Sequence, residues 1–183
     1  MKNAHHLHHF IHNIYLRNAL NAAVSRGRVY AANPMPPAKI AFRDQCKQLL
    51  TALGIRYYAW EWDLPRFCQE IVDFSNTISR SHSAVLAGGR LRVGTAQKMI
   101  SLYLKYLWLS GDPSKKPIGA VLDRPILQAS GYPNPPDWTK LDDIDIYKEI
   151  QDAISKKAAS DGFGSPAVWE AEKWGIDEQD EEG

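Results

Sequence analysis

A basic, glycine-containing turn that leads directly into a long apolar helix constrains the fold more than any other stretch. The turn spans residues 88–92 and the predicted helix residues 93–108. Apolar residues recur there every three or four positions, which predicts the most strongly amphipathic helix of the chain, with one face in the core. These residues are Ala96, Met99, Ile100, Tyr103, Leu104, Leu107 and Trp108. We expect Lys98, Ser101 and Lys105 on a different face, which gives this core helix a positively charged side.

The rest of the chain predicts a mainly α fold with weak strand signals. Helices are expected over about residues 4–24, 38–53, 63–81, 123–130, 142–158 and 165–174. Gly54 is expected to end the second helix, and the aromatic stretch 55–63 to form a short strand or an irregular wedge against the core. A chain of 183 residues can bury a proper core. We therefore expect one compact helical bundle over residues 1–176, followed by an acidic tail over residues 177–183.

The formal net charge of +1 conceals a strong asymmetry between the two parts of the chain. Residues 1–116 carry sixteen Lys and Arg against six Asp and Glu, and residues 117–183 carry six against fifteen. This split is typical of a polyanion-binding half with an acidic end that shields it. The alternative is that both sets of charges mix over one surface after folding. The densest basic region is residues 80–116, which contain seven Lys and Arg and one acid, Asp112.

Several classes of protein are disfavoured by the sequence. No apolar run approaches the roughly 20 residues of a membrane-spanning helix, and the first residues lack a secretory hydrophobic segment. Cys46 and Cys68 are expected to be reduced core thiols, which fits a cytoplasmic protein. His5, His8, His9 and His12 recur at helical spacing, but no acidic or cysteine ligand lies nearby, so we favour a solvent-facing cluster over a metal site. Phosphate-loop, zinc, nucleophile-elbow and dinucleotide motifs are missing, so no cofactor is expected.

Two residues, Lys98 and Asp123, lie in settings that suggest chemistry. Lys98 is predicted in the first turn of its helix, near Arg90 and Arg92, where partial burial and like charges lower the pKa of an ammonium group. An amine in that state is a nucleophile capable of Schiff-base chemistry at a sugar C1′. Asp123 precedes a predicted helix and could stabilise a cationic sugar or assist deprotonation. The alternatives are that Lys98 is an exposed helix lysine and that Asp123 is only an N-cap.

At these residues the chain resembles the helix-hairpin-helix DNA glycosylase superfamily, especially its 8-oxoguanine glycosylase-like members. Residues 93–98 (Val-Gly-Thr-Ala-Gln-Lys) are similar to the glycine turn and lysine helix of that family, and residues 121–127 (Val-Leu-Asp-Arg-Pro-Ile-Leu) to its valine-aspartate element. The resemblance covers residues 88–131. It implies that Lys98 is the catalytic nucleophile and Asp123 its partner, and that the turn's backbone amides, with Arg90 and Arg92, grip phosphate.

The first hypothesis is therefore a base-excision glycosylase that flips a damaged or modified base out of double-stranded DNA, with or without lyase activity, and without a cofactor. The expected nucleic-acid contacts are Arg80, His82, Arg90, Arg92, Gly94, Thr95, Lys105, Lys115 and Lys116. A second hypothesis is a non-enzymatic helical module that binds nucleic acid through the same basic region. A third is a protein-interaction domain whose basic and acidic halves face partners or each other.

Overall fold

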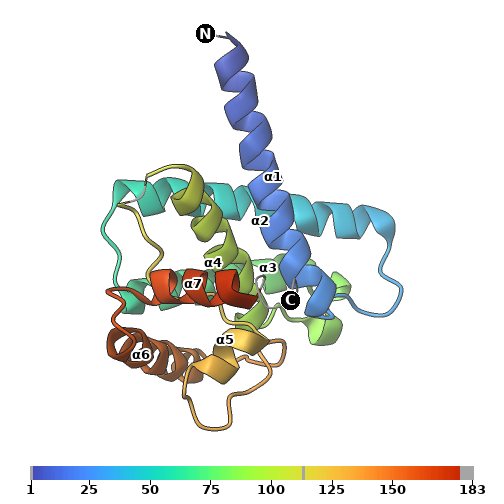
Figure 1. Cartoon of the computed structure of the whole chain (residues 1–183). Coiled ribbons are helices and arrows are strands. Elements are labelled where there is room, and N and C mark those ends of the chain that lie inside the picture. Colours follow the sequence, from blue (N-terminus) through green and yellow to red (C-terminus); the bar gives the residue numbers. More distant parts are fainter. Residues whose placement is uncertain (1, 113, 178–183) are drawn as a thin grey trace.

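The computed structural model describes residues 2–112 and 114–177, with side chains described from Phe10 to Lys173 except at position 113. Within these residues the chain forms seven α-helices, two short 3-10 turns and no strand. The helices are α1 (Lys2–Arg26), α2 (Pro36–Ala59), α3 (Leu64–His82), α4 (Val93–Ser110), α5 (Arg124–Ala129), α6 (Ile144–Ser160) and α7 (Pro166–Asp177) (Figure 1). The prediction of a mainly α fold is confirmed. The predicted acidic tail, apart from its first residue, lies outside the described residues.

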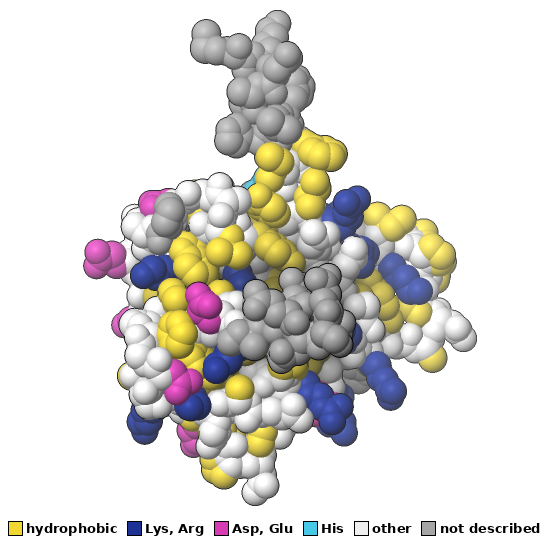
Figure 2. All heavy atoms as spheres, viewed as in Figure 1, with side chains coloured by type: hydrophobic (Ala, Val, Ile, Leu, Met, Phe, Trp, Pro, Cys, Tyr) yellow, Lys and Arg dark blue, Asp and Glu magenta, His cyan; other side chains and the backbone are white. Residues whose placement is uncertain are grey.

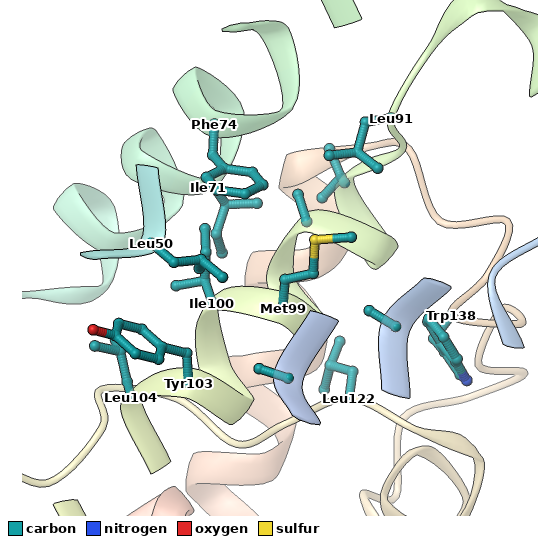
Figure 3. Packing of buried hydrophobic residues seen from close by; sticks show 14 of the residues in the cluster. Leu50, Ile71, Phe74, Leu91, Met99, Ile100, Tyr103, Leu104, Leu122 and Trp138 are labelled. Atoms are coloured by element: carbon teal, nitrogen blue, oxygen red, sulfur yellow. The ribbon is translucent and has the colours of Figure 1, made fainter. Parts of the chain in front are cut away.

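Helix α4 lies at the centre of the fold and packs against α1, α2 and α3. Its first nine residues are all buried, as are Tyr103 and Leu104. Side chains of α2 and α3 lie on one side of α4 in Figure 3, and Leu122 and Trp138 lie on the other. The prediction that this is the most amphipathic helix is therefore wrong. Over these first nine residues α4 is enclosed by its neighbours and has no solvent face, and α3, with its single buried stripe, is the more one-sided helix.

Helix α2 does not end at Gly54 but continues for five further residues, to Ala59. Gly54 is buried, and a Cβ at this position would lie 2.9 Å from the ring and hydroxyl of Tyr103. The glycine therefore serves the close approach of α2 to α4 rather than the end of a helix. The predicted strand or wedge over residues 55–63 is also wrong. Residues 55–59 belong to α2, and only residues 60–63 form a connection.

Three helices in the described chain begin at an aspartate that caps them. Asp63 accepts a hydrogen bond from the Arg66 amide, Asp123 from the Ile126 amide, and Asp143 from the amides of Asp145 and Ile146. Such caps satisfy amides that have no partner within the helix. The predicted helix starts at Asp63 and Asp123 are confirmed, and the cap places the Asp123 carboxyl group beside α4.

Helix α1 leaves the body of the protein at its N-terminal end and lies against it over its C-terminal half (Figure 1). The middle of α1 is fixed to α4, because His12 forms a 2.6 Å hydrogen bond with the Tyr103 hydroxyl and Tyr15 stacks on Tyr106. Cys46 and Cys68 are buried and unbridged, as predicted. Among the described helices, none is long and apolar enough to span a lipid bilayer.

Candidate active site

Lys98 and Asp123 form a buried ion pair. The Lys98 Nζ lies 3.5 Å from the Asp123 Oδ2, and the two side chains are 4% and 2% exposed. The other carboxylate oxygen, Oδ1, accepts the Ile126 amide at 3.2 Å, so Asp123 caps α5 and faces Lys98 at the same time. The alternative of an exposed helix lysine is wrong. Lys98 is the sixth residue of α4 rather than part of its first turn, and its depth in the protein comes from the helices around α4.

The surroundings of Lys98 favour its neutral amine. Burial is the main cause that lowers the pKa of Lys98, and Arg26 acts in the same direction, while Asp123 opposes both. The Nζ also lies 4.7 Å from the centre of the Trp138 ring, a contact that favours the charged form. Burial prevails, and the pKa of Lys98 is lower than that of an ordinary lysine. Such a lysine supplies a larger fraction of nucleophile near neutral pH.

A second buried ion pair lies beside the first. The Lys105 Nζ lies 2.9 and 3.0 Å from the two carboxylate oxygens of Glu170, which is 2% exposed and belongs to α7. Burial raises the pKa of the Glu170 carboxyl group, and Lys105 opposes that rise. The charges of Lys98 and Asp123 also act on Glu170, so the two pairs lie within electrostatic reach of each other. None of the sequence patterns singled out Glu170.

Lys98 and both members of the second pair line one cavity. A hollow of about 360 Å³ between α1, α4 and α7 is lined by residues of both pairs, namely Lys98, Lys105 and Glu170, together with Arg26, Leu102 and Tyr106. Its volume falls within the range of sites that hold small organic ligands. Arg26 also borders a neighbouring hollow of about 610 Å³, next to Arg124 and Trp138. Lys98 therefore lies at the wall of a space that a ligand can enter.

Two buried glutamines hold the segment that leads to Asp123. Gln97 donates from Nε2 to the Leu122 carbonyl at 3.1 Å and accepts the Leu122 amide at 3.3 Å. Gln151 pairs in the same two-sided way with Ala120, at 2.9 and 3.0 Å. A primary amide can replace a neighbouring strand because it offers one donor and one acceptor side by side. These glutamines, which the sequence reasoning missed, fix the position of Asp123 relative to Lys98.

The backbone amides of the first two residues of α4 are hydrogen-bonded within the protein. The Gly94 amide donates to the Leu141 carbonyl at 2.8 Å, and the Val93 amide donates to Asp142 at 3.1 Å. Gly94 and Thr95 are both buried. The amide of Gly94, an expected nucleic-acid contact, is therefore already satisfied by the loop before α6, as is the neighbouring amide of Val93.

The basic residues of region 80–116 do not form one cluster. Arg90 pairs with Asp142 at 2.6 Å, Arg92 donates to the Thr139 carbonyl at 3.0 Å, and both lie before the start of α4. Lys115 and Lys116 follow the other end of this 18-residue helix, which is about 27 Å long. Arg80 is exposed at the end of α3, where His82 hydrogen-bonds Gln45 at 2.6 Å. Lys98, Lys105 and Arg90 each pair with an acid of the second half, so part of the charge asymmetry is neutralised by folding.

The histidine prediction is tested only at His12, which contacts Tyr103 as described above. The side chains of His5, His8 and His9 lie outside the described residues. Elsewhere in the described chain, no three His, Cys, Asp or Glu side chains come together as a metal site.

We compared the chain with known protein families, curated proteins and solved structures. No family model, curated protein or solved structure matches it significantly.

Proposed function

We propose that the protein is a lysine-dependent DNA glycosylase with associated lyase activity, in which Lys98 is the nucleophile and Asp123 its partner. The observation that carries this proposal is the buried Lys98–Asp123 pair, whose lysine lines a cavity. Two buried charges cost more to desolvate than their attraction usually returns, and well-packed apolar residues often stabilise a fold better. An ionic pair that borders a cavity, with a lysine of lowered pKa, is therefore a typical candidate for a functional site.

The chemistry follows from the positions of the two groups. The neutral Lys98 amine attacks the sugar C1′, forming the N–C1′ bond, while the bond between C1′ and the base breaks and the base leaves with the electron pair. Asp123 stabilises the positive charge that develops on the sugar and accepts the proton that the lysine nitrogen then loses. Asp123 returns this proton to the ring oxygen as the C1′–O4′ bond breaks, which gives a protonated Schiff base between Lys98 and C1′. Loss of a C2′ proton to solvent then forms the C2′–C3′ double bond and expels the 3′-phosphate with the electrons of its bond to C3′.

Exposed cations beside the cavity provide a surface for the DNA backbone. Arg26 and Arg124 are both exposed; Arg26 borders both hollows, and Arg124 borders the larger one. Arg92, which lies before the start of α4, is also exposed. In the view of Figure 2, acidic side chains lie mainly on the left of the molecule and the right side shows mostly basic ones. Such a surface would hold phosphate groups without reading sequence. In this proposal Arg26 and Arg124 replace the helix-start amides as phosphate contacts.

A duplex that contains one abasic site tests the nucleophile without knowledge of the target base, because its free C1′ aldehyde condenses directly with an amine. We expect borohydride to trap a covalent adduct with the wild-type protein and not with Lys98→Gln. Glutamine at position 98 can still donate a hydrogen bond to Asp123. Lys156→Gln, at an exposed lysine of α6, is the matched control and should trap as the wild type does.

The result also separates the alternatives. An adduct that persists in Lys98→Gln assigns the amine to another residue and overturns the proposal. Salt-sensitive DNA binding without any adduct supports a non-enzymatic nucleic-acid module instead. A protein that binds no nucleic acid even at low salt supports a protein-interaction domain.

A further inference from the structure

The Lys105–Glu170 pair is not used by the chemistry at the sugar. It borders the same cavity as Lys98, and its two members come from α4 and α7. Lys105 follows Lys98 by seven residues, which places the two lysines two turns, or about 10 Å, apart along one side of α4. A base held in this cavity beside Lys98 would lie within reach of Lys105, because both lysines line it. The pair is therefore placed to meet the far edge of that base.

We propose that Lys105, held in place by Glu170, is a second catalytic residue that contacts a carbonyl oxygen of the departing base and stabilises its negative charge. This inference rests on the glycosylase function proposed above. It assigns the substrate to neutral bases with a carbonyl beside a ring N–H, since cleavage of their bond to C1′ leaves an anion whose charge is shared with the carbonyl oxygen. The electron pair of the broken bond stays with the base, which takes up a proton from solvent after release.

The geometry supports this role in two ways. Glu170 contacts Lys105 through both oxygens and is almost fully buried, so the ammonium is oriented before a ligand arrives. A preoriented charge stabilises developing charge more effectively than solvent does, because it needs no reorganisation at the moment of reaction. The contact strengthens as the base becomes negative, which is the condition for acceleration rather than mere binding.

The charges around the cavity also restrict the substrate. Lys105 carries the positive charge that the proposed contact requires, and it lines the cavity. A base that already carries a positive charge, such as an alkylated purine, leaves as a neutral molecule and would be repelled rather than stabilised by the Lys105 ammonium. A base that has no carbonyl lacks the atom that Lys105 is proposed to contact. Both kinds of base are therefore expected to be poor substrates.

The test compares base removal with trapping at an abasic site, which has no base to expel. Duplexes with uracil, hypoxanthine or 8-oxoguanine provide neutral carbonyl bases, and duplexes with 7-methylguanine or ethenoadenine provide a cationic base and one without a carbonyl. We expect excision of at least one base of the first set and neither of the second. Lys105→Gln should lower that excision about 100-fold, the loss seen when one preoriented donor is removed. Its trapping at the abasic site should stay within about twofold of wild type.

Two further variants guard against a folding defect. Lys105→Arg keeps the cation and should retain most excision. The double variant Lys105→Gln/Glu170→Gln removes both charges, so that no unpaired carboxylate remains buried, and should excise as poorly as Lys105→Gln. Lys156→Gln again serves as the control.

Failure of this inference differs from failure of the proposed function. If Lys98-dependent trapping occurs but Lys105→Gln excises at the wild-type rate, or 7-methylguanine is the preferred base, the role of Lys105 is overturned. If Lys105→Gln and the double variant lose trapping together with excision, the pair merely supports the Lys98 site, and the inference is again overturned. If wild-type protein gives no adduct at all, the proposed function itself fails.

Discussion

Gly94 lies directly against the backbone of Trp138, so closely that a Cβ at position 94 would overlap the Trp138 carbonyl oxygen. The same approach brings the Gly94 amide to the Leu141 carbonyl and leaves the Trp138 ring over Lys98. One glycine therefore sets the distance between the start of α4 and the loop that covers the candidate nucleophile.

Gly94→Ala should force this loop away from α4. Because the obstructing atom belongs to the backbone and not to a flexible side chain, we expect a loss of about 3 kcal/mol in the free energy of unfolding. Urea unfolding monitored by circular dichroism measures this loss. Gly164→Ala is the control, since a Cβ there meets nothing within 4 Å, and it should change stability by less than about 0.5 kcal/mol. Equal stability of the two variants would contradict the close approach.

The buried pair should show strong coupling in a double-mutant cycle. Lys98→Met leaves the Asp123 carboxylate buried without its counter-charge, which typically costs about 3–5 kcal/mol. Adding Asp123→Asn to this variant removes the stranded charge while an amide oxygen still caps α5. We therefore expect the double variant to be more stable than Lys98→Met alone, measured by urea unfolding of all four proteins. Additive effects of the two substitutions would show that the groups do not interact.

Local signals explain what the sequence could predict of the fold. The caps at Asp63 and Asp123 were recognised because a cap depends on residues only three positions apart. Gly54 was misread because a glycine that ends a helix and one that allows two helices to touch look alike in a sequence. The prediction of a positively charged, exposed side on α4 failed because the spacing of apolar residues indicates one buried side of a helix. It does not show how many other elements pack around that helix.

The candidate site was predictable only where a known arrangement linked distant residues. Lys98 and Asp123 are 25 positions apart, and the resemblance to glycosylases supplied the pairing that spacing alone cannot. Glu170 lies 65 positions from Lys105, and no local pattern relates the two. The sequence does contain a signal for Gln97, because a polar amide within a helix that is buried needs hydrogen-bond partners. Which backbone groups it pairs with depends on the fold.

Gln97→Leu tests whether Gln97 positions Asp123 relative to Lys98. Leucine has a similar volume but leaves the Leu122 amide and carbonyl unpaired, which should cost about 2–4 kcal/mol for two buried groups. The segment before Asp123 would lose one of its two attachments, so the rate of abasic-site trapping should fall about tenfold while Lys98 remains present. Single-turnover trapping at saturating protein measures this rate.

Gln48→Leu, at an exposed position of α2, is the matched control. It removes an amide of the same type without a buried partner and should keep both stability and trapping. A Gln97→Leu protein that traps at the wild-type rate would show that Gln97 does not position Asp123.

The pH dependence of trapping should report the titration of Lys98. Only the neutral amine condenses with the C1′ aldehyde, so the rate should rise about tenfold per pH unit below the pKa of Lys98 and level off above it. Because burial lowers this pKa, the midpoint should fall below the ordinary value of 10.5. Asp123 acts in the opposite direction and raises the pKa, so Asp123→Asn should move the midpoint to still lower pH, even where the maximal rate is reduced. Trapping rates across a pH series with both proteins give the two midpoints. A midpoint at or above 10.5 in the wild type, or an upward shift in Asp123→Asn, would show that Lys98 is not the buried amine that reacts.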